Sequence, residues 1–460
     1  MQLTFLLHEN EAKYRQIYAH IKQLIETKMI HENEKLPSIR ALAENLHVSR
    51  NTTLLAYELL LAEGYIRTEP KKGYYVNHLE PLYLQQAAPI KQTVPRETAP
   101  DVINFRLGAV DAQHFPLKKW RQLSNALLKE ANAYTYGENF GEPPLKEQLA
   151  HYLMQARGMH VMPEQIIIGS STQQLLLHIS FLLKESFSSI IVEDPGYTGV
   201  REVFTLQQFQ LEAITVTESG IQLDELAQKN SALIYVTPSH HYPLGTALSI
   251  SERLQLIQWA YNVDGYILED DYDSEYRYAQ KTLPALASLD QARIVYFGTF
   301  SKAFLPGIRL AYMVLPAPLL TRFKQTFQHV EHNASLLHQL TMAEFMRSGE
   351  WERHIKRMRM IYKKKMNVLT GALLHHFGEQ IDVIGTKAGL YLLIRVHTKQ
   401  TEAQLIEKAH SKQVNVYETS SLFFGTNQTK PHLLLGFANL TEAQLKEGVA
   451  RLKVAWGDIF

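Results

Sequence analysis

The chain has 460 residues, of which 45% are hydrophobic, and its formal net charge at pH 7 is only +1. This length exceeds what one hydrophobic core usually spans, so we expect more than one domain of ordinary globular composition. The balanced charge excludes attraction of nucleic acid by net charge alone, and the absence of cysteine excludes disulfides and thiolate metal sites.

Residues 1–78 have the pattern of a small head with three helices, because apolar residues recur at helical spacing in three stretches. Ser38 and Ser49 are the predicted N-caps of the second and third helices, and Gly64 ends the third. Two short strand candidates, 65–67 and 74–76, follow and predict a β-wing, so the order is that of a winged helix-turn-helix. The predicted core residues are Ile17, Ile21 and Ile25, then Ala41, Leu42 and Leu46, then Leu55, Ala56, Leu59 and Leu60.

Residues 79–100 predict a linker. Pro81, Pro89, Pro95 and Pro100 punctuate a polar stretch that has no usable periodicity. Such a stretch is extended rather than helical, and it is long enough for two domains to move or for a head to cross to a partner chain.

From residue 101 to residue 460, strand-like apolar runs alternate with helical patterns, which predicts an α/β domain. Continuous apolar runs suit a parallel sheet covered on both faces, and polar residues follow each run, where the carboxyl ends of such strands bind ligands. From about residue 360 the pattern suits a smaller α+β subdomain. The clearest predicted strands are 166–168, 189–192, 232–236, 266–268 and 294–297.

Lys302 is the central candidate for chemistry. It follows a predicted strand and a Gly-Thr turn, and Arg309 lies seven residues further on. A lysine amine condenses with an aldehyde when its pKa is depressed, whereas most lysines are solvated surface cations. Thr299, Ser301 and Arg309 offer hydroxyls and a guanidinium to a phosphate.

Further motifs stand at the ends of other predicted strands. In Gly169–Gln174, Ser171 and Thr172 open a helix whose backbone N–H groups suit a phosphate, although an ordinary N-cap explains them equally. The acidic run Glu269–Tyr276 offers a carboxylate to a pyridine nitrogen. A metal site and a solvated loop are its alternatives, and no His or Cys spacing supports zinc. The remaining motifs are Glu193–Tyr197, which offers an aromatic ring, and Thr237–Gly245.

These motifs carry a resemblance to known proteins. Residues from about 101 to 460 resemble fold-type I aminotransferases, and with the head nearly the whole chain resembles the MocR/GabR group of bacterial regulators, in which a GntR-type head is fused to an aminotransferase-like body. The matching phrases are Glu269–Tyr276, Thr237–Gly245, Gly298–Arg309 and His354–Arg359.

The resemblance implies pyridoxal 5'-phosphate as cofactor, with Lys302 forming the internal aldimine and Asp270 facing the pyridine nitrogen. It also implies that Tyr272 contacts the phenolic oxygen of the cofactor and that Tyr197 stacks on its ring. Phosphate would be bound by Ser171, Thr172, Thr299, Ser301 and Arg309, Tyr136 would reach the phosphate of the partner subunit, and His240 stands where many aminotransferases have asparagine.

One departure from the family pattern concerns the arginine that clamps a substrate carboxylate near the C-terminus of many fold-type I enzymes. Leu434 stands at the comparable place, which puts ordinary amino-acid transamination in doubt. Arg201 is the candidate that would bind an effector instead, and a cation on a helix surface is the other interpretation of this residue.

In the head, the GntR-type pattern implies that Arg40 and the first turn of the third helix contact DNA. Phosphate contacts fix the register and base-edge contacts specify the sequence, and Arg50 is the main candidate reader. A surface helix with exposed polar groups is the alternative. The candidate contacts are Arg40, Ser49, Arg50, Asn51, Thr52 and Thr53, with Lys71 and Lys72 from the wing.

We therefore predict a regulator that binds double-stranded operator DNA and senses pyridoxal phosphate or an amine or amino-acid effector at Lys302, with genes of vitamin B6 or amino-acid metabolism as candidate targets. The alternatives are an active aminotransferase with a DNA-binding head, and a plain repressor whose body only dimerises. The resemblance implies a homodimer, with heads that pack on the other chain's body in a domain-swapped arrangement. No stretch approaches about 18 uncharged apolar residues, so we expect no membrane contact and a cytoplasmic protein.

Overall fold

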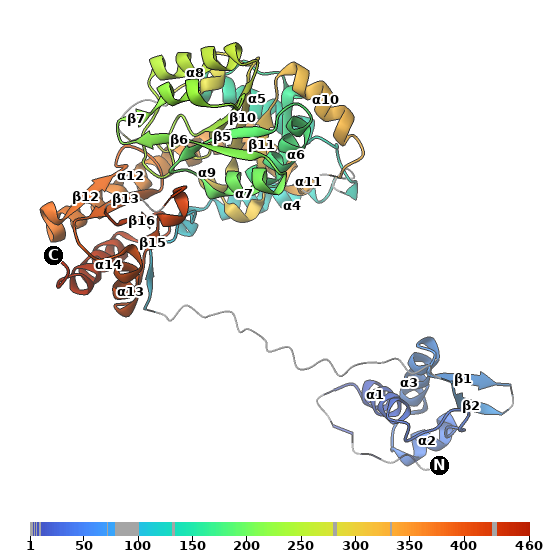
Figure 1. The fold of residues 1–460 in the computed structure, drawn as a ribbon. Helices are drawn as coiled ribbons and strands as arrows, with labels where there is room; N and C mark the ends of the chain where they lie inside the picture. Colours follow the sequence, from blue (N-terminus) through green and yellow to red (C-terminus); the bar gives the residue numbers. More distant parts are fainter. Residues whose placement is uncertain are drawn as a thin grey trace. The chain divides into compact units, whose positions relative to one another are not determined.

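The computed structural model describes residues 3, 5, 7–8, 11–70, 72–78, 101–130, 134–278, 283–331, 334–425 and 430–460. The chain divides into two compact units, Met1–Arg96 and Glu97–Phe460 (Figure 1). The predicted linker over 79–100 lies outside the described residues. Within the described parts, every helix is too short or too polar to cross a membrane.

The first unit has the predicted winged helix-turn-helix order. The side chains of Ser38 and Ser49 accept hydrogen bonds from the backbone N–H groups of Ala41 and Thr52, so both predicted N-caps are confirmed. The two strands pair antiparallel and form the wing. The elements are α1 (Lys13–Glu26), α2 (Ile39–Asn45), α3 (Arg50–Ala62), β1 (Ile66–Glu69) and β2 (Gly73–Val76).

Some of the predicted core positions of the head are wrong. Ala41 is exposed and Ala43 is buried in its place, because the apolar stripe of α2 runs through Leu42, Ala43 and Leu46. On α3 the exposed fractions of Leu55 and Leu59 are 47% and 37%. The buried stripe of this helix is Thr53, Ala56, Tyr57 and Leu60, which has the spacing of one helix face and turns both leucines outward.

The second unit is built on an eight-stranded sheet with the order β4-β11-β10-β9-β8-β5-β6-β7. The sheet is mixed rather than parallel as predicted, because β11 pairs antiparallel with both β10 and β4, and β7 pairs antiparallel with β6. All the strands predicted from the sequence nevertheless run in one direction. The strands are β4 (Ile166–Gly169), β5 (Ser189–Asp194), β6 (Gln210–Thr217), β7 (Gly220–Ile221), β8 (Leu233–Val236), β9 (Tyr266–Asp271), β10 (Ile294–Thr299) and β11 (Ala311–Val314).

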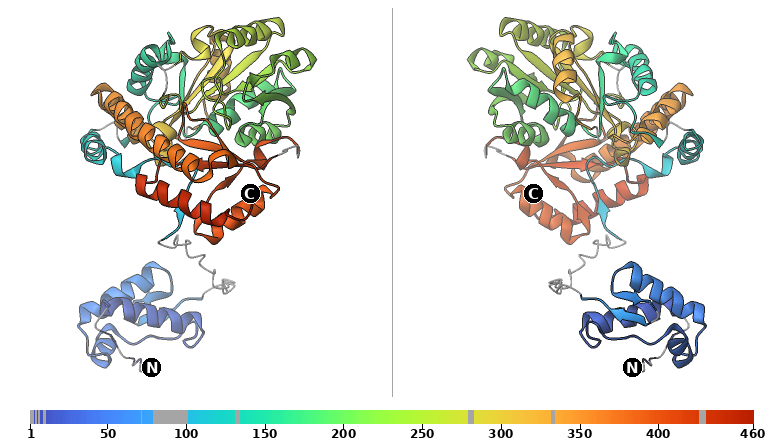
Figure 2. Two further views of the ribbon diagram at one scale, coloured as in Figure 1. Left: turned by 90° about the vertical axis from the view of Figure 1, so that its left-hand side faces the viewer. Right: turned by 90° about the vertical axis from the view of Figure 1, so that its right-hand side faces the viewer.

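Helices cover both faces of this sheet (Figures 1 and 2). Along β4, Ile166 and Ile168 join the core on one face and Ile167 joins the core on the other, which explains the unbroken apolar run. One face is covered by α6 (Thr172–Lys184), α7 (Thr198–Leu206) and α10 (Ala317–Phe327). The other is covered by α4 (Leu117–Leu127), α5 (Pro143–Arg157), α8 (Ile250–Asn262), α11 (Leu336–Arg347) and the start of α12 (Glu350–Phe377).

The C-terminal part forms the smaller α+β subdomain. Its antiparallel sheet has the order β12-β13-β16-β15. A separate short strand early in the unit, β3 (Ile103–Asn104), pairs in parallel with β14 (Val414–Asn415), so these residues belong to the small subdomain. The other elements are β12 (Ile381–Ile384), β13 (Tyr391–Val396), β15 (Tyr417–Glu418), β16 (His432–Gly436), α13 (Glu402–Ser411) and α14 (Glu442–Ala455).

Candidate functional site

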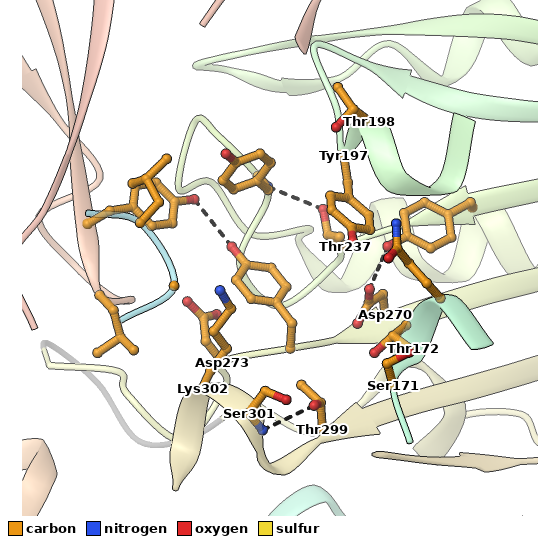
Figure 3. Close-up of a pocket in the computed structure, with 18 of the residues that line it drawn as sticks. Ser171, Thr172, Tyr197, Thr198, Thr237, Asp270, Asp273, Thr299, Ser301 and Lys302 are labelled. Carbon is orange, nitrogen blue, oxygen red and sulfur yellow. Dashed lines mark hydrogen bonds between the residues drawn. The ribbon is translucent and has the colours of Figure 1, made fainter. Parts of the chain in front are cut away.

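The carboxyl ends of the parallel strands meet at a cavity of about 360 Å³, where polar side chains from separate strands face a common space (Figure 3). This is the edge at which open α/β sheets bind ligands. The cavity brings together nine of the residues singled out from the sequence. They are Ser171, Thr172, Tyr197, Asp270, Tyr272, Thr299, Ser301, Lys302 and Arg309.

Lys302 lies on α9 (Phe300–Ala303), the short helix that directly follows β10. Burial lowers the pKa of its amine, and the carboxylates of Asp273 and Asp270 oppose this shift. The amine lies so close to the backbone of Gly108 that a Cβ there would come within 2.7 Å of Nζ. A lysine amine whose neutral form is favoured by burial is a candidate nucleophile.

Asp270 lies at the end of β9 and is buried. Its Oδ2 accepts a hydrogen bond of 2.5 Å from the hydroxyl of Tyr235, whereas Oδ1 has no partner among the described residues. Burial is the largest of the effects that raise the pKa of Asp270 to about 7. An unpartnered carboxylate oxygen in a cavity wall can accept a hydrogen bond from a protonated ring nitrogen, so this residue fits the role that the resemblance implies.

The raised pKa of Asp270 predicts a pH dependence of stability in the cofactor-free protein. The ordinary pKa is 3.8 and the folded value is about 7, so between these values the folded state keeps a proton that the unfolded state releases. The contribution to stability is therefore full below about pH 4 and is lost as the pH rises to about 7. We expect the Asp270→Asn variant to lose this part of the slope, about 1.4 kcal/mol per pH unit.

Denaturant titrations at several pH values between about 5 and 8 measure this slope. Asp224→Asn, at an exposed position of the same unit, is the control and should retain the slope of the parent protein. Equal slopes for the parent and the Asp270→Asn variant would contradict the assignment.

The neighbours of Asp270 in the acidic run point away from the cavity, as strand alternation requires. Glu269 accepts hydrogen bonds from the backbone N–H groups of Leu286 and Ala287. Asp271 forms an ion pair with Arg157, at 2.6 Å. The run is therefore neither a solvated loop nor, within the described residues, part of a cluster that could hold a metal ion.

The polar end of the cavity suits a phosphate. Ser171 is the N-cap of α6 and Thr172 is its first residue, so both lie at the positive end of the helix dipole. Thr299 accepts a hydrogen bond from the backbone N–H of Ser301, which orders the turn before Lys302. Arg309 adds a guanidinium from a backbone with φ of 53°. Two turns that carry hydroxyls and one cation form a complementary set for an anion.

His240 does not line the cavity but supports two residues that do. Its Nδ1 lies 2.8 and 2.9 Å from the two carboxylate oxygens of Asp273 and 3.0 Å from the hydroxyl of Tyr272. The Tyr272 hydroxyl also lies 3.2 Å from that of Tyr391. Asp273 lines the cavity but was not singled out from the sequence. A period of two would have placed it with Glu269 and Asp271 on the side away from the cavity, but β9 ends at Asp271, so the alternation does not extend to residue 273.

Other lining residues were also missed. Thr237 and Tyr242 lay inside a motif that was recognised, but no role was given to them. Leu107 and Gly108 precede the sheet, while Leu390, Tyr391 and Leu422 come from the small subdomain. No local pattern marked these positions, because they reach the cavity only through the packing of the two subdomains.

The structure does not support Arg201 as an effector residue. Its guanidinium donates to the carbonyl oxygens of Gly196 at 3.1 Å, Phe423 at 3.3 Å and Leu422, and it lies over the ring of Phe424. These contacts hold the segment 422–424 against α7, so in this structure the guanidinium is engaged by backbone carbonyls and does not face the cavity. Burial lowers the pKa of this guanidinium.

Two other positions lie away from the cavity. Tyr136 is 98% exposed and does not line the cavity of its own chain, so its implied contact with a partner subunit stays a prediction. Leu434 is fully buried in β16, where it pairs with Leu393 and Tyr417.

In the head, Ser49, Arg50 and Asn51 are exposed in the first turn of α3, and Thr52 is partly buried. Thr53 is fully buried, so it is excluded as a DNA contact; its place on the inner stripe of α3 turns it toward the core. The exposed side chains of Arg40 and Lys72 form ion pairs with Glu44 and Glu69. Lys71 lies outside the described residues.

Both units match known protein families. Residues 100–452 match the family described as aminotransferase class I and II, and residues 13–76 match the bacterial regulatory proteins of the gntR family. Among solved structures, the chain is similar to LysN, an α-aminoadipate aminotransferase from Thermus thermophilus. The TM-score is 0.71 and the identity 24%, over 79% of this chain and 94% of that chain. This likeness shows the fold of the second unit.

Relatives of similar length contain both units. The uncharacterized HTH-type transcriptional regulator YdeL of Bacillus subtilis is 38% identical over 96% of each chain. The probable rhizopine catabolism regulatory protein MocR of Rhizobium meliloti is 30% identical over 96% of this chain and 93% of its own length. The HTH-type pyridoxine biosynthesis transcriptional regulator PdxR of Corynebacterium glutamicum is 29% identical over 97% of each chain.

Proposed function

Because the chain belongs to the family of transcriptional regulators that join a GntR-type DNA-binding domain to an aminotransferase class I and II domain, we propose that it binds operator DNA in a manner controlled by a ligand at Lys302. The predicted resemblance to MocR-type regulators, the predicted fold class and the predicted cofactor, pyridoxal 5'-phosphate, are confirmed. The effector, the role of Lys302 and the target genes are proposals.

The observation that carries the proposal is that one cavity contains both the buried amine of Lys302 and an unpartnered carboxylate oxygen of Asp270. Pyridoxal 5'-phosphate supplies an aldehyde carbon that forms a C=N bond with a primary amine, releasing one water, and it exchanges one amine for another without net change of atoms or electrons. Lys302 offers that amine, and Asp270 accepts the hydrogen bond of the ring nitrogen. Arg309 and the hydroxyls of both turns bind the phosphate.

We propose genes of vitamin B6 metabolism as targets, because a relative that spans the whole chain is named for the regulation of pyridoxine biosynthesis. An active aminotransferase is the alternative. Arg309 is the sole guanidinium among the described residues that line the cavity, and the proposed phosphate site uses it. Among the described lining residues no second guanidinium then remains to clamp the carboxylate of an amino-acid substrate, which favours sensing over turnover.

The proposed assembly is a cytoplasmic homodimer that presents two heads, and we extend it to the domain-swapped arrangement in which each head packs on the partner's body. A dimer of this kind reads paired half-sites on DNA. Ligand binding changes operator affinity only if the two DNA-binding states differ in their affinity for the ligand, and typical couplings of about 1–3 kcal/mol change affinity by about 5–150-fold.

Arg50→Ala tests the DNA-binding part of the proposal. Arg50 is exposed in the first turn of the recognition helix, where a side chain reaches base edges or phosphates. We expect the variant to lose about 5–150-fold in affinity, since one good base contact contributes about 1–3 kcal/mol. Gel-shift titration on a fragment selected from a random DNA pool by the cofactor-loaded parent protein measures the loss.

Arg15→Ala is the matched control, because Arg15 is an exposed arginine of the same head that lies on α1 rather than on α3. It should keep the parent affinity, and both variants should load the cofactor fully. Parent affinity in Arg50→Ala, or an equal loss in Arg15→Ala, would refute the assignment of the reading helix.

A further inference from the structure

We propose that the effector of this cavity is a small primary amine that carries no carboxylate. The proposal rests on the function proposed above and narrows its ligand class. It follows from the lining residues that are left to contact an effector once the cofactor-binding groups have been assigned, and from the charges of these residues.

The polar groups of the cavity fall into two sets. The first set surrounds the proposed phosphate and ring-nitrogen positions, and it contains the single lining guanidinium of the described residues, Arg309. Lys302 is the amine that the cofactor engages. When the effector's amine takes its place on the cofactor, the amine of Lys302 is released beside the carboxylates of Asp273 and Asp270. No other lining cation of the described part of the chain is left for a second anion.

Among the described residues, the remaining wall contains leucines, phenols and one carboxylate, and no cation other than Lys302. Its members are Leu107, Tyr242, Leu390, Tyr391, Leu422 and Asp273, and the neutral polar side chains of Gln173, Thr198 and Thr237 complete the lining. Asp273 is 2% exposed, and His240 holds both of its carboxylate oxygens. A carboxylate on the effector would lose its hydration against this wall and would meet a like charge, whereas a methyl group would pack on the leucines.

Neither of the two positions considered for a carboxylate clamp supplies a cation to the cavity. Arg201 donates to the carbonyl oxygens of Gly196, Leu422 and Phe423, and it does not line the cavity. Leu434, at the position of the family's clamp, is a fully buried apolar residue of β16. The guanidinium of Arg201 could reach the cavity only by breaking its contacts with these carbonyl oxygens.

The volume limits the size of the ligand. At about 360 Å³ the cavity lies at the small end of the range for ligand sites, about 300–1,000 Å³. Most of this space is needed for the cofactor, so the effector is a short amine rather than a long one.

The test compares n-butylamine with 4-aminobutanoate, which differ by one methyl group against one carboxylate at the same distance from the amine. Each compound is titrated into the cofactor-loaded protein, and the change in the visible absorbance of the cofactor gives a binding constant without any turnover. We expect n-butylamine to bind at least about tenfold more tightly.

Two variants separate charge from shape. Leu107→Arg places a guanidinium in a partly exposed part of the wall, and it should favour 4-aminobutanoate by about tenfold relative to the parent; Leu107→Met is its control of similar volume and should keep the parent preference. Asp273→Asn removes the like charge and should narrow the preference for n-butylamine, which provides a second reading if Leu107→Arg fails to fold.

Equal binding of the two compounds to the parent protein would overturn the inference, and so would a spectrum that neither compound changes. Failure of the proposed function has a different signature, since the parent protein would then acquire no visible cofactor band before any amine is added.

Discussion

Replacing Lys302 with alanine is expected to abolish covalent capture of pyridoxal 5'-phosphate while the fold persists. Lys302 is the single amine of the described residues that lines the cavity, and an alanine side chain cannot form the C=N bond. Reduction of the loaded protein with borohydride, followed by mass spectrometry, should find the cofactor on residue 302 of the parent and on no residue of the variant. The visible absorbance band should disappear with it.

Two variants control this experiment. Lys356→Ala removes an exposed lysine of α12 and should leave the trapped cofactor on Lys302 unchanged. Lys302→Arg keeps a positive charge but cannot form the bond, so it should behave as the alanine variant does. Burial disfavours the charged form of Lys302, so removal of this side chain should not destabilise the fold. Unfolding curves like those of the parent would show this. A cofactor still trapped in Lys302→Ala would refute the assignment.

Replacing Arg157 with methionine is expected to destabilise the second unit by about 3–5 kcal/mol, because it leaves a buried carboxylate without its cation. Arg157 and Asp271 lie 2.6 Å apart, and each side chain is 1% exposed. Arg157 also donates to the Ser239 hydroxyl at 2.8 Å. Denaturant unfolding of the full chain, read from the tryptophan fluorescence that the head lacks, measures the loss.

Arg322→Met is the matched control, since it breaks an ion pair with Glu185 whose side chains are 40% and 61% exposed. Exposed pairs contribute about 0–1 kcal/mol, so this variant should unfold nearly as the parent does. Adding Asp271→Asn to Arg157→Met should recover part of the loss, because the unpaired charge is then gone. An equal, small loss of unfolding free energy in both arginine variants would show that the buried pair stabilises the protein no more than the exposed pair does.

The sequence was sufficient to predict five strands of the large sheet, β4, β5, β8, β9 and β10, and the polar residues at their ends. Short apolar runs such as 166–168 are recognisable because burial on both faces leaves no polar position in them. Parallel strands place their carboxyl ends at one edge, so Ser171, Asp270 and Lys302 had to converge. The strands β6, β7 and β11 of this sheet were missed. β11 has a similar apolar pattern to the predicted strands, and this pattern carries no information on strand direction.

The walls supplied by the small subdomain could not be predicted. Leu390 and Tyr391 reach the cavity through the packing of one subdomain on the other, which depends on contacts between residues far apart in the chain. The position of Arg201 in the sequence suggests a free cation. Its true partners are backbone carbonyls, and carbonyl positions follow from the fold rather than from residue type.

The acidic run shows that simple alternation could have been used further. Period two along β9 separates Asp270 from Glu269 and Asp271, and it therefore predicts one ligand-facing carboxylate between two structural ones. Helical periodicity could have been applied to Thr53 in the same way. The spacing of Ala56, Tyr57 and Leu60 places Thr53 on the inner face and removes it from the DNA-reading surface.

The strand β3 places the start of the second unit close to the cavity along the chain. The head joins the body through the chain that enters at Ile103, where β3 is stitched to β14, and only five residues later Gly108 presses against the amine of Lys302. Only five residues of backbone therefore separate the neighbour of that amine from the strand at which the chain enters the second unit. One short piece of backbone, from Ile103 to Gly108, thus contacts both the small subdomain and the amine of Lys302.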